Sequence, residues 1–262
     1  MRDLLERLMK GEISLNEAEK LLRLSAIEEV ERIAKIDVSR EERKGIPEII
    51  LAEGKNVNDT LRIAKAFVDR KGRAIISRAN DNLFKLVKRK FRNNFDIMLN
   101  RDAKIVVIKK KGYKVEKTGG RIGIITAGTS DIPIAEEAKI VAEEMGCEVI
   151  TEYDVGVAGI HRLFPALKNM IEKDVDVIVV IAGREGALPS VISSMVNIPI
   201  IAVPTSIGYG LGERGVGALI AMLQSCSLGL AVVNIDGGVQ AGAIAALIAN
   251  RVAKWRNKCP II

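Results

Sequence analysis

Aromatic residues and histidine are scarce in this chain of 262 residues. Only 3% of the residues are aromatic, and the whole sequence contains one histidine, His161. So few aromatic rings argue against a base-stacking platform for single-stranded nucleic acid. With one histidine and no closely spaced cysteine pair, the residues needed for a zinc finger are missing.

Cysteines and long apolar runs are also few. The three cysteines, Cys147, Cys226 and Cys259, are odd in number and far apart, which excludes a disulfide framework. No run approaches the ~20 apolar residues that a membrane span needs. The charged, amphipathic start lacks the apolar stretch of a secretory signal. We therefore expect a soluble, cytoplasmic protein with no membrane association.

The net charge of +7 is unevenly distributed along the chain. Residues 61–120 carry 18 Lys and Arg against 5 Asp and Glu, whereas residues 121–262 carry 11 against 14. A basic segment of this kind can bind a nucleic acid, attract a small anion or merely form a solvated surface. Because its basic residues are scattered over predicted helices and strands and form no recognisable module, we expect no nucleic-acid partner.

The amino-terminal part is predicted to form helices followed by a small α/β domain. Residues 1–40 are expected to be helical, because Leu4, Leu5 and Leu8 share one helix face. Ser14 and Glu17 have the spacing of a capping box for a helix that continues through Ala18, Leu21 and Leu22. After a turn-prone stretch, short apolar runs predict strands at 48–52, 73–77 and 104–108, and helical patterns cover 57–68 and 82–91.

From Gly119-Gly120 onward the pattern becomes regular. Apolar runs rich in Val and Ile cover 122–126, 148–155, 175–181, 198–203 and 230–235, each separated from the next by a helical pattern. Near-continuous runs indicate strands buried on both faces, hence a parallel sheet with helices on both sides. We expect an α/β protein with a flavodoxin-like doubly wound sheet in residues 119–262, preceded by a domain in residues 1–118. In such sheets ligands bind at the carboxyl ends of the strands.

Two predicted strand ends carry groups suited to an anion or to proton transfer. The first is followed by Gly128-Thr129-Ser130-Asp131, where a tight turn, hydroxyl groups and a helix start suit a phosphate or carboxylate. The alternative is that Ser130 or Asp131 simply caps the helix. The second strand is followed by His161-Arg162, so any acid–base role for imidazole in this chain falls to His161.

Two further positions are candidates for covalent or base chemistry. Glu185 follows the third strand and lies between two glycines. It is a candidate base, or else a carboxylate that the start of a helix favours. Cys226 lies between a predicted helix and a predicted strand. It is either a small buried residue that fills space or a nucleophile, and the sequence does not decide between these two roles. The glycine-rich segment 204–215 matches neither a Rossmann fingerprint nor a Walker loop.

Taken together, the strand-end stretches resemble the PurE family, the aminoimidazole ribonucleotide carboxylases and mutases of purine synthesis. The resemblance rests on Gly128-Thr129-Ser130-Asp131-Ile132-Pro133, His161-Arg162, Ala182-Gly183 and Leu188-Pro189. In that family the first motif holds the ribose phosphate, and the histidine handles the proton exchanged for carboxylate. Two departures are evident, because Ala187 stands where PurE proteins carry a second histidine, and those proteins lack the amino-terminal domain.

The LarB family, the pyridinium-3,5-biscarboxylic acid mononucleotide synthases, is similar over more of the chain, residues 35–255. The matching stretches are Asp37, Arg40, Arg43 with Gly45-Ile46-Pro47-Glu48, then Glu185-Gly186-Ala187-Leu188-Pro189-Ser190, and Ser225-Cys226 before the last strand. This resemblance implies carboxylation of the pyridinium ring of nicotinic acid adenine dinucleotide by carbon dioxide. It also implies hydrolysis of the phosphoanhydride to release AMP, as part of nickel-pincer cofactor synthesis.

The same resemblance implies roles for individual residues. Cys226 would add to the ring, Glu185 would remove the ring proton, and His161 with Arg162 would orient a carboxylate or serve the hydrolysis. The implied substrate-binding set is Gly128, Thr129, Ser130, Asp131, Arg162, Gly183 and Asp236.

Magnesium is the implied cofactor, with Asp131 and Asp236 as possible ligands, and no redox cofactor is expected. The PurE-like half implies a homo-octamer. The alternative function is that of an aminoimidazole ribonucleotide carboxylase or mutase.

Overall fold

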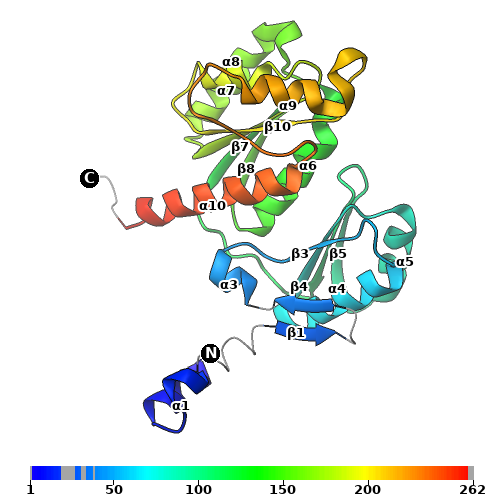
Figure 1. Ribbon diagram of the computed structural model, residues 1–262, viewed down its shortest axis with the longest axis vertical. Helices are drawn as coiled ribbons and strands as arrows, with labels where there is room; N and C mark the ends of the chain where they lie inside the picture. Colours follow the sequence, from blue (N-terminus) through cyan, green and yellow to red (C-terminus); the bar gives the residue numbers. More distant parts are fainter. Residues whose placement is uncertain (1, 19–26, 31–33, 38, 259–262) are drawn as a thin grey trace. The chain divides into compact units, whose positions relative to one another are not determined.

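The computed structural model describes residues 2–18, 27–30, 34–37 and 39–258. These divide into two compact units, one from residues 1–99 and 106–113 and the other from residues 100–105 and 114–262. Figure 1 shows both units. In the described part of the chain, no helix is both long and apolar enough to cross a bilayer.

The first unit starts with helix α1, Arg2–Met9, and a capped helical turn. The predicted capping box is confirmed, because the Glu17 amide donates to Ser14 Oγ at 3.2 Å and the Ser14 amide donates to Glu17 Oε2 at 3.0 Å. Leu21 and Leu22, predicted on the same helix, lie outside the described residues.

The prediction that helix extends to residue 40 is wrong. Strands β1, Ile27–Val30, and β2, Ala34–Asp37, pair antiparallel instead. The sequence of β2 alternates apolar and polar residues, which is the period of a strand rather than of a helix.

A mixed four-stranded sheet forms the core of the first unit. Its strands are β3 (Ile49–Leu51), β4 (Arg73–Ser77), β5 (Phe95–Asn100) and β6 (Ile105–Lys110), in the order β3-β4-β6-β5. Strand β3 is parallel to β4, and β4 is antiparallel to β6. The predicted strands at 48–52, 73–77 and 104–108 are confirmed, whereas β5 was missed.

Three helices accompany this sheet: α3 (Arg40–Lys44), α4 (Val57–Lys71) and α5 (Asp81–Phe91). The apolar faces of α4 and α5 pack with β4 and β6 in one buried cluster that includes Phe67 and Phe91. Asn side chains cap α4 and α5, each accepting a first-turn amide, as expected for residues that favour this position.

The second unit contains the predicted doubly wound sheet. Its strands are β7 (Arg121–Thr126), β8 (Glu148–Glu152), β9 (Val177–Ala182), β10 (Ile200–Pro204) and β11 (Leu230–Val232). All pairs are parallel and the order is β11-β10-β9-β7-β8, which is the flavodoxin-like order. Every residue of the central strand β9 is buried, which explains its unbroken Val-Ile-Val-Val-Ile-Ala sequence.

Helices cover both faces of this sheet. Helices α6 (Ile132–Glu144) and α10 (Gly238–Arg256, orange to red in Figure 1) pack on each other and on β7. Helices α7 (Leu163–Glu172), α8 (Leu188–Ser193) and α9 (Val216–Leu223) supply the apolar cluster of the opposite face. The close approach of α10 to α6 requires glycine, because a Cβ at Gly242 would lie 2.9 Å from the Cα of Ala138.

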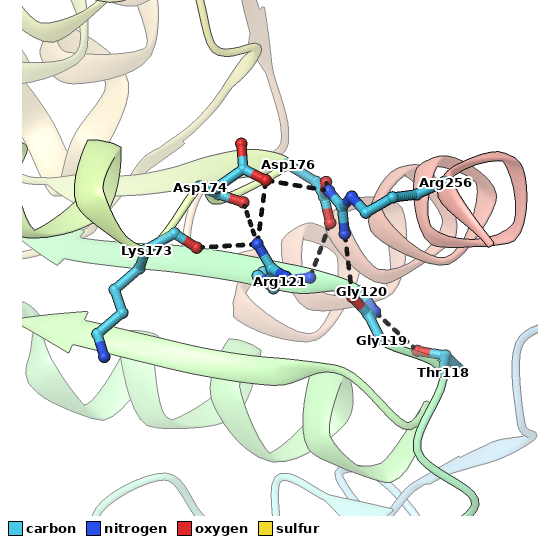
Figure 2. A network of polar contacts seen from close by, with 8 residues as sticks. All are labelled: Thr118, Gly119, Gly120, Arg121, Lys173, Asp174, Asp176 and Arg256. Carbon is cyan, nitrogen blue, oxygen red and sulfur yellow. Dashed lines mark hydrogen bonds and ion pairs between the residues drawn. The ribbon is translucent and has the colours of Figure 1, made fainter. Parts of the chain in front are cut away.

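A polar network fastens the amino-terminal edge of this sheet (Figure 2). The Asp176 carboxylate accepts the Arg121 amide at 2.8 Å and forms an ion pair with the Arg256 guanidinium from the end of α10. Arg256 also donates to the Gly119 carbonyl at 3.3 Å, and the Arg121 guanidinium pairs with Asp174 at 3.0 Å. These contacts tie β7, β9 and α10 together at the edge opposite the carboxyl ends of the strands.

Candidate functional site

The carboxyl edge of the parallel sheet is formed by short irregular segments. The turn η1, Thr129–Asp131, follows β7, and η2, Val157–Arg162, follows β8. The third segment follows β9 from Gly183, and η3, Gly210–Gly215, lies beyond β10. Because neighbouring strands lie only about 4.8 Å apart, the predicted residues after β7, β8 and β9 fall within one region.

Asp131 occupies the centre of this edge and is buried, with 4% of its surface exposed. Its Oδ1 accepts the Thr205 hydroxyl at 2.7 Å and its Oδ2 accepts the Gly128 amide at 3.0 Å. Burial raises the pKa of this carboxyl, and the hydrogen bonds from Thr205, Gly128 and the Gly183 amide oppose that rise. Asp131 therefore joins the ends of β7, β9 and β10, while the neighbouring Thr129 and Ser130 are exposed.

Gly183 and Asp236 complete this junction. A Cβ at Gly183 would lie 2.6 Å from Thr205 Oγ1 and closer still to the Ile207 carbonyl oxygen, so no larger residue fits. Asp236 adopts a left-handed backbone conformation with φ of 55°, and its Oδ1 accepts the Ser206 amide at 2.8 Å. Both residues hold the segment after β10 in place, which is a structural reason for glycine and aspartate at these positions.

The residues at this edge do not match a metal site made by the protein alone. Both oxygens of Asp131 already accept hydrogen bonds from protein donors, and Asp236 accepts a backbone amide. Among the described residues, no three His, Cys, Asp or Glu side chains converge as metal ligands would. Magnesium is commonly held by few protein carboxylates together with substrate phosphates.

His161 and Arg162 lie side by side on η2, as predicted, and both are exposed. The Arg162 guanidinium donates to Asp154 Oδ2 at 2.5 Å, and the Asp154 amide donates to the Thr126 hydroxyl at 3.0 Å. Arg162 is thereby oriented from the end of β7. The imidazole of His161 lies at the surface, where solvent and a ligand can both reach it.

Glu185 is exposed and lines a pocket of about 450 Å³. The pocket is bounded by the segment after β9, by η3 and by the amino-terminal part of α9. A carboxylate that lines such a pocket can take a proton from a bound ligand. The structure thus places the candidate base where a small molecule has room to bind.

Cys226 is exposed and lies in the turn between α9 and β11. Hydroxyl groups fix this turn to α8 on both sides of the cysteine. Ser225 and Ser190 share a hydrogen bond of 2.8 Å, and Ser227 and Ser193 share another of 2.8 Å. An exposed thiol in a restrained turn differs from the buried Cys147, whose pKa burial raises to about 11, so Cys226 is not a small buried filler.

The candidate nucleophile and the candidate base lie at opposite edges of the parallel sheet. Glu185 follows the carboxyl end of β9, whereas Cys226 precedes the amino end of β11. Within the described chain no hydrogen bond or ion pair links Cys226 with Glu185 or His161. The connection between them runs through α8, which begins three residues after Glu185 and holds the Cys226 turn.

Sequence reasoning missed three residues of the Glu185 pocket: Arg184, Tyr209 and Arg214. The Arg184 guanidinium lies over the Tyr209 ring, 4.1 Å from its centroid. The available signal was the density of glycines in segment 204–215, which indicated a special loop but not its contact with the segment after β9.

Comparison with known proteins matches both halves of the chain. A family model described as AIR carboxylase matches residues 121–258, and one described as LarB/PurE-like N-terminal domain matches residues 27–111. An uncharacterized protein of Methanocaldococcus jannaschii is 50% identical over 97% of this chain and 98% of its own length.

Two relatives of the carboxy-terminal half have named activities. An N5-carboxyaminoimidazole ribonucleotide mutase of Methanocaldococcus jannaschii is 33% identical over 52% of this chain and 88% of its own length. The mutase of the same name from Thermotoga maritima is 30% identical over 49% of this chain and 74% of its own length.

The fold and the matched half define a PurE-like α/β protein of the carboxylase and mutase class. More particularly, the chain belongs to the AIR carboxylase family and combines that domain with an amino-terminal domain of the LarB/PurE-like type.

Proposed function

We propose that the chain carboxylates the pyridinium ring of nicotinic acid adenine dinucleotide and hydrolyses its phosphoanhydride. The products would be pyridinium-3,5-biscarboxylic acid mononucleotide and AMP, for nickel-pincer cofactor synthesis. The observation that carries this proposal is the union of the AIR carboxylase domain with a LarB/PurE-like N-terminal domain in one chain. The exposed Cys226, restrained on both sides, supports it further.

The ring carbon that must attack carbon dioxide is not nucleophilic in a pyridinium, because the ring is electron-poor. Addition of the Cys226 thiolate forms a carbon–sulfur bond and shifts an electron pair to the ring nitrogen, which gives an enamine-like ring. A carbon of this ring then attacks carbon dioxide and forms the new carbon–carbon bond. Glu185 accepts the proton from that carbon, and expulsion of the thiolate restores the aromatic pyridinium.

The remaining candidates act on the charged groups of the substrate. Exposed Thr129 and Ser130, with the Gly128 turn, are proposed to hold a phosphate. His161 and Arg162 would orient a carboxylate or assist the hydrolysis of the anhydride. Magnesium held by the anhydride phosphates would neutralise part of their charge.

We further propose that the protein forms a homo-oligomer and that a second copy completes the reaction centre. The PurE resemblance implies an octamer. Three side chains of α9, Val216, Ile220 and Leu223, are 45%, 50% and 65% exposed and share one helix face. An exposed apolar stripe of this kind indicates a surface that another protein copy covers. Light scattering on the eluting protein should give a mass several times that of one chain, and a monomer would contradict this part of the proposal.

The reaction is tested by incubating the protein with nicotinic acid adenine dinucleotide, bicarbonate and magnesium. We expect AMP and a pyridine mononucleotide heavier than nicotinate mononucleotide by one carboxylate. Cys226→Ala should abolish that product, whereas Leu228→Ala, a change at a 90% exposed side chain of the same turn, should not. Turnover by Cys226→Ala at the rate of the unaltered protein would refute the covalent step.

The second candidate function is that of an aminoimidazole ribonucleotide carboxylase or mutase. The named mutases at 30–33% identity favour it. Ala187 argues against it, because the second histidine of PurE proteins is absent from that position, and the amino-terminal domain does so as well. Conversion of N5-carboxyaminoimidazole ribonucleotide by the purified protein, with no reaction on the dinucleotide, would decide for this alternative.

A further inference from the structure

The Glu185 pocket contains a group of residues that the proposed chemistry does not use. It measures about 450 Å³, which is enough for part of a nucleotide. Besides Glu185, its walls include two arginines, one tyrosine and two glycines at the start of α9: Arg184, Arg214, Tyr209, Gly215 and Gly217.

Among its described side chains, two arginines and one glutamate, Glu185, give this pocket a net positive charge. Among the described side chains, neither Arg184 nor Arg214 lies within ion-pair distance of an Asp or Glu. The amino end of α9 also borders the pocket, and Gly215, its N-cap residue, offers no side chain to its first-turn amides. Two arginines and the positive end of a helix together favour a phosphate group.

A flat stacking surface adjoins these charges. The Arg184 guanidinium lies 4.1 Å from the centroid of the Tyr209 ring, and Tyr209 as a whole residue is 84% exposed. A heteroaromatic base can stack on such a surface and bury apolar area without disturbing the protein. The pocket thus combines the two recognition elements of a nucleotide, a phosphate site and a ring platform.

The backbone of the pocket favours a functional interpretation of these side chains. Arg184 and Arg214 adopt left-handed conformations, with φ of 53° and 46°, which cost free energy in residues other than glycine. The Arg184 amide donates to the Ile207 carbonyl at 3.2 Å, so the segment after β9 and the segment after β10 hold each other in this arrangement. Both arginines thus occupy strained backbone positions in the wall of the pocket.

We propose that Arg184, Arg214 and Tyr209 form a binding site for a nucleoside monophosphate group. The phosphate lies between the two arginines and the amino end of α9, and the base stacks on Tyr209. If the proposed function holds, this group is the adenylate half of the dinucleotide, and Glu185 in the same pocket faces the part of the substrate that loses a proton.

Titration calorimetry with AMP on the full chain tests the site. The Arg184→Gln, Arg214→Gln and Tyr209→Ala variants should each weaken AMP binding by about tenfold or more, the effect of losing one charge-assisted or stacking contact. Tyr209→Phe keeps the ring and should bind AMP like the unaltered protein. Arg251→Gln removes an exposed arginine of α10, away from the pocket, and should also change nothing.

Two simpler probes separate the contributions of phosphate and base. Adenosine should bind at least about tenfold more weakly than AMP and should be insensitive to Arg214→Gln, because it lacks the phosphate. Inorganic phosphate should compete with AMP and should be insensitive to Tyr209→Ala. The proposal is overturned if AMP does not bind, or if Arg251→Gln weakens AMP binding as much as the two pocket arginines do.

The outcomes distinguish this site from the proposed reaction. If AMP binds with the expected dependence on Arg184 and Arg214 but no carboxylated product forms, the nucleotide site stands and the proposed function fails. If the dinucleotide is carboxylated and Arg184→Gln and Arg214→Gln leave KM unchanged, the reaction stands and the site is wrong. Fluorescence of the single tryptophan verifies that each variant is folded.

Discussion

Replacement of Thr205 by valine tests the buried junction that organises the carboxyl edge of the sheet. The side chain of Thr205 is fully buried, and its hydroxyl donates to Asp131 Oδ1 at 2.7 Å. Valine has nearly the same shape but no donor, so the carboxylate loses one charge-assisted hydrogen bond. Such bonds contribute about 1.5–3 kcal/mol, and we expect Thr205→Val to lower the free energy of unfolding by about 2 kcal/mol at pH 7.

The pH dependence of this loss has a defined sign. Burial raises the pKa of Asp131 above its ordinary value of 3.8, so the folded protein binds this proton more tightly than the unfolded chain does. The stability from the protonated form is complete below pH 3.8 and is lost as the pH rises through the folded-state pKa. Removing the Thr205 hydroxyl raises that pKa further, so the destabilisation should be larger at pH 7 than at pH 4.

Urea unfolding followed by tryptophan fluorescence measures this effect. The single tryptophan, Trp255 on α10, lies in the second unit together with Thr205 and Asp131, so the signal reports the unfolding of that unit. Thr205→Ser keeps the hydroxyl and is the matched control. A loss of stability equal at both pH values, or equal in the serine and valine variants, would refute the assignment of the effect to the Asp131 hydrogen bond.

Three further changes probe other contacts. Gly183→Ala places a Cβ 2.6 Å from a neighbouring hydroxyl oxygen, so a lower melting temperature is expected, and a melting temperature equal to that of the unaltered protein would disprove the crowding. Arg256→Ala leaves the 2% exposed Asp176 side chain without its guanidinium partner, and urea unfolding should record a loss of about 3 kcal/mol. An unchanged free energy of unfolding would contradict the role given to this ion pair. Ser190→Ala releases one side of the turn that holds the candidate nucleophile, so iodoacetamide should alkylate that cysteine at a changed rate. The hydroxyl of Ser194 donates to the Val191 carbonyl of α8 and, among the described residues, not to the turn, so Ser194→Ala should leave the rate unaltered. Equal rates in both variants would exclude a role for the Ser190 contact.

The parallel sheet of the second unit could be predicted from the sequence because burial on both faces leaves unbroken Val and Ile runs, such as β9. Strand β5 was missed because its residues alternate between half-buried and exposed, which is a weaker signal. The β1–β2 pair was mistaken for helix because the helical pattern of the preceding residues was extended over it, and each strand has only four residues. Edge and two-stranded structures depend on pairing partners that a local pattern does not contain.

The sequence predicted where the site residues lie in the fold, but only part of what their side chains contact. Parallel topology brings the residues after β7, β8 and β9 to one edge, so Thr129, His161 and Glu185 could be placed there from strand order alone. That Asp131 is buried and bonded to Thr205 could not, because this contact joins segments 74 residues apart. The stacking of Arg184 on Tyr209 was beyond sequence reasoning for the same reason.

The fate of labelled bicarbonate tests the central claim most directly. The protein is incubated with carbon-13 bicarbonate, magnesium and equal amounts of nicotinic acid adenine dinucleotide and aminoimidazole ribonucleotide. The products are then separated, and their masses are measured by mass spectrometry. We predict that the label enters a pyridine mononucleotide with two carboxylates, together with release of AMP. Label found only in a carboxylated aminoimidazole ribonucleotide would contradict the proposed reaction.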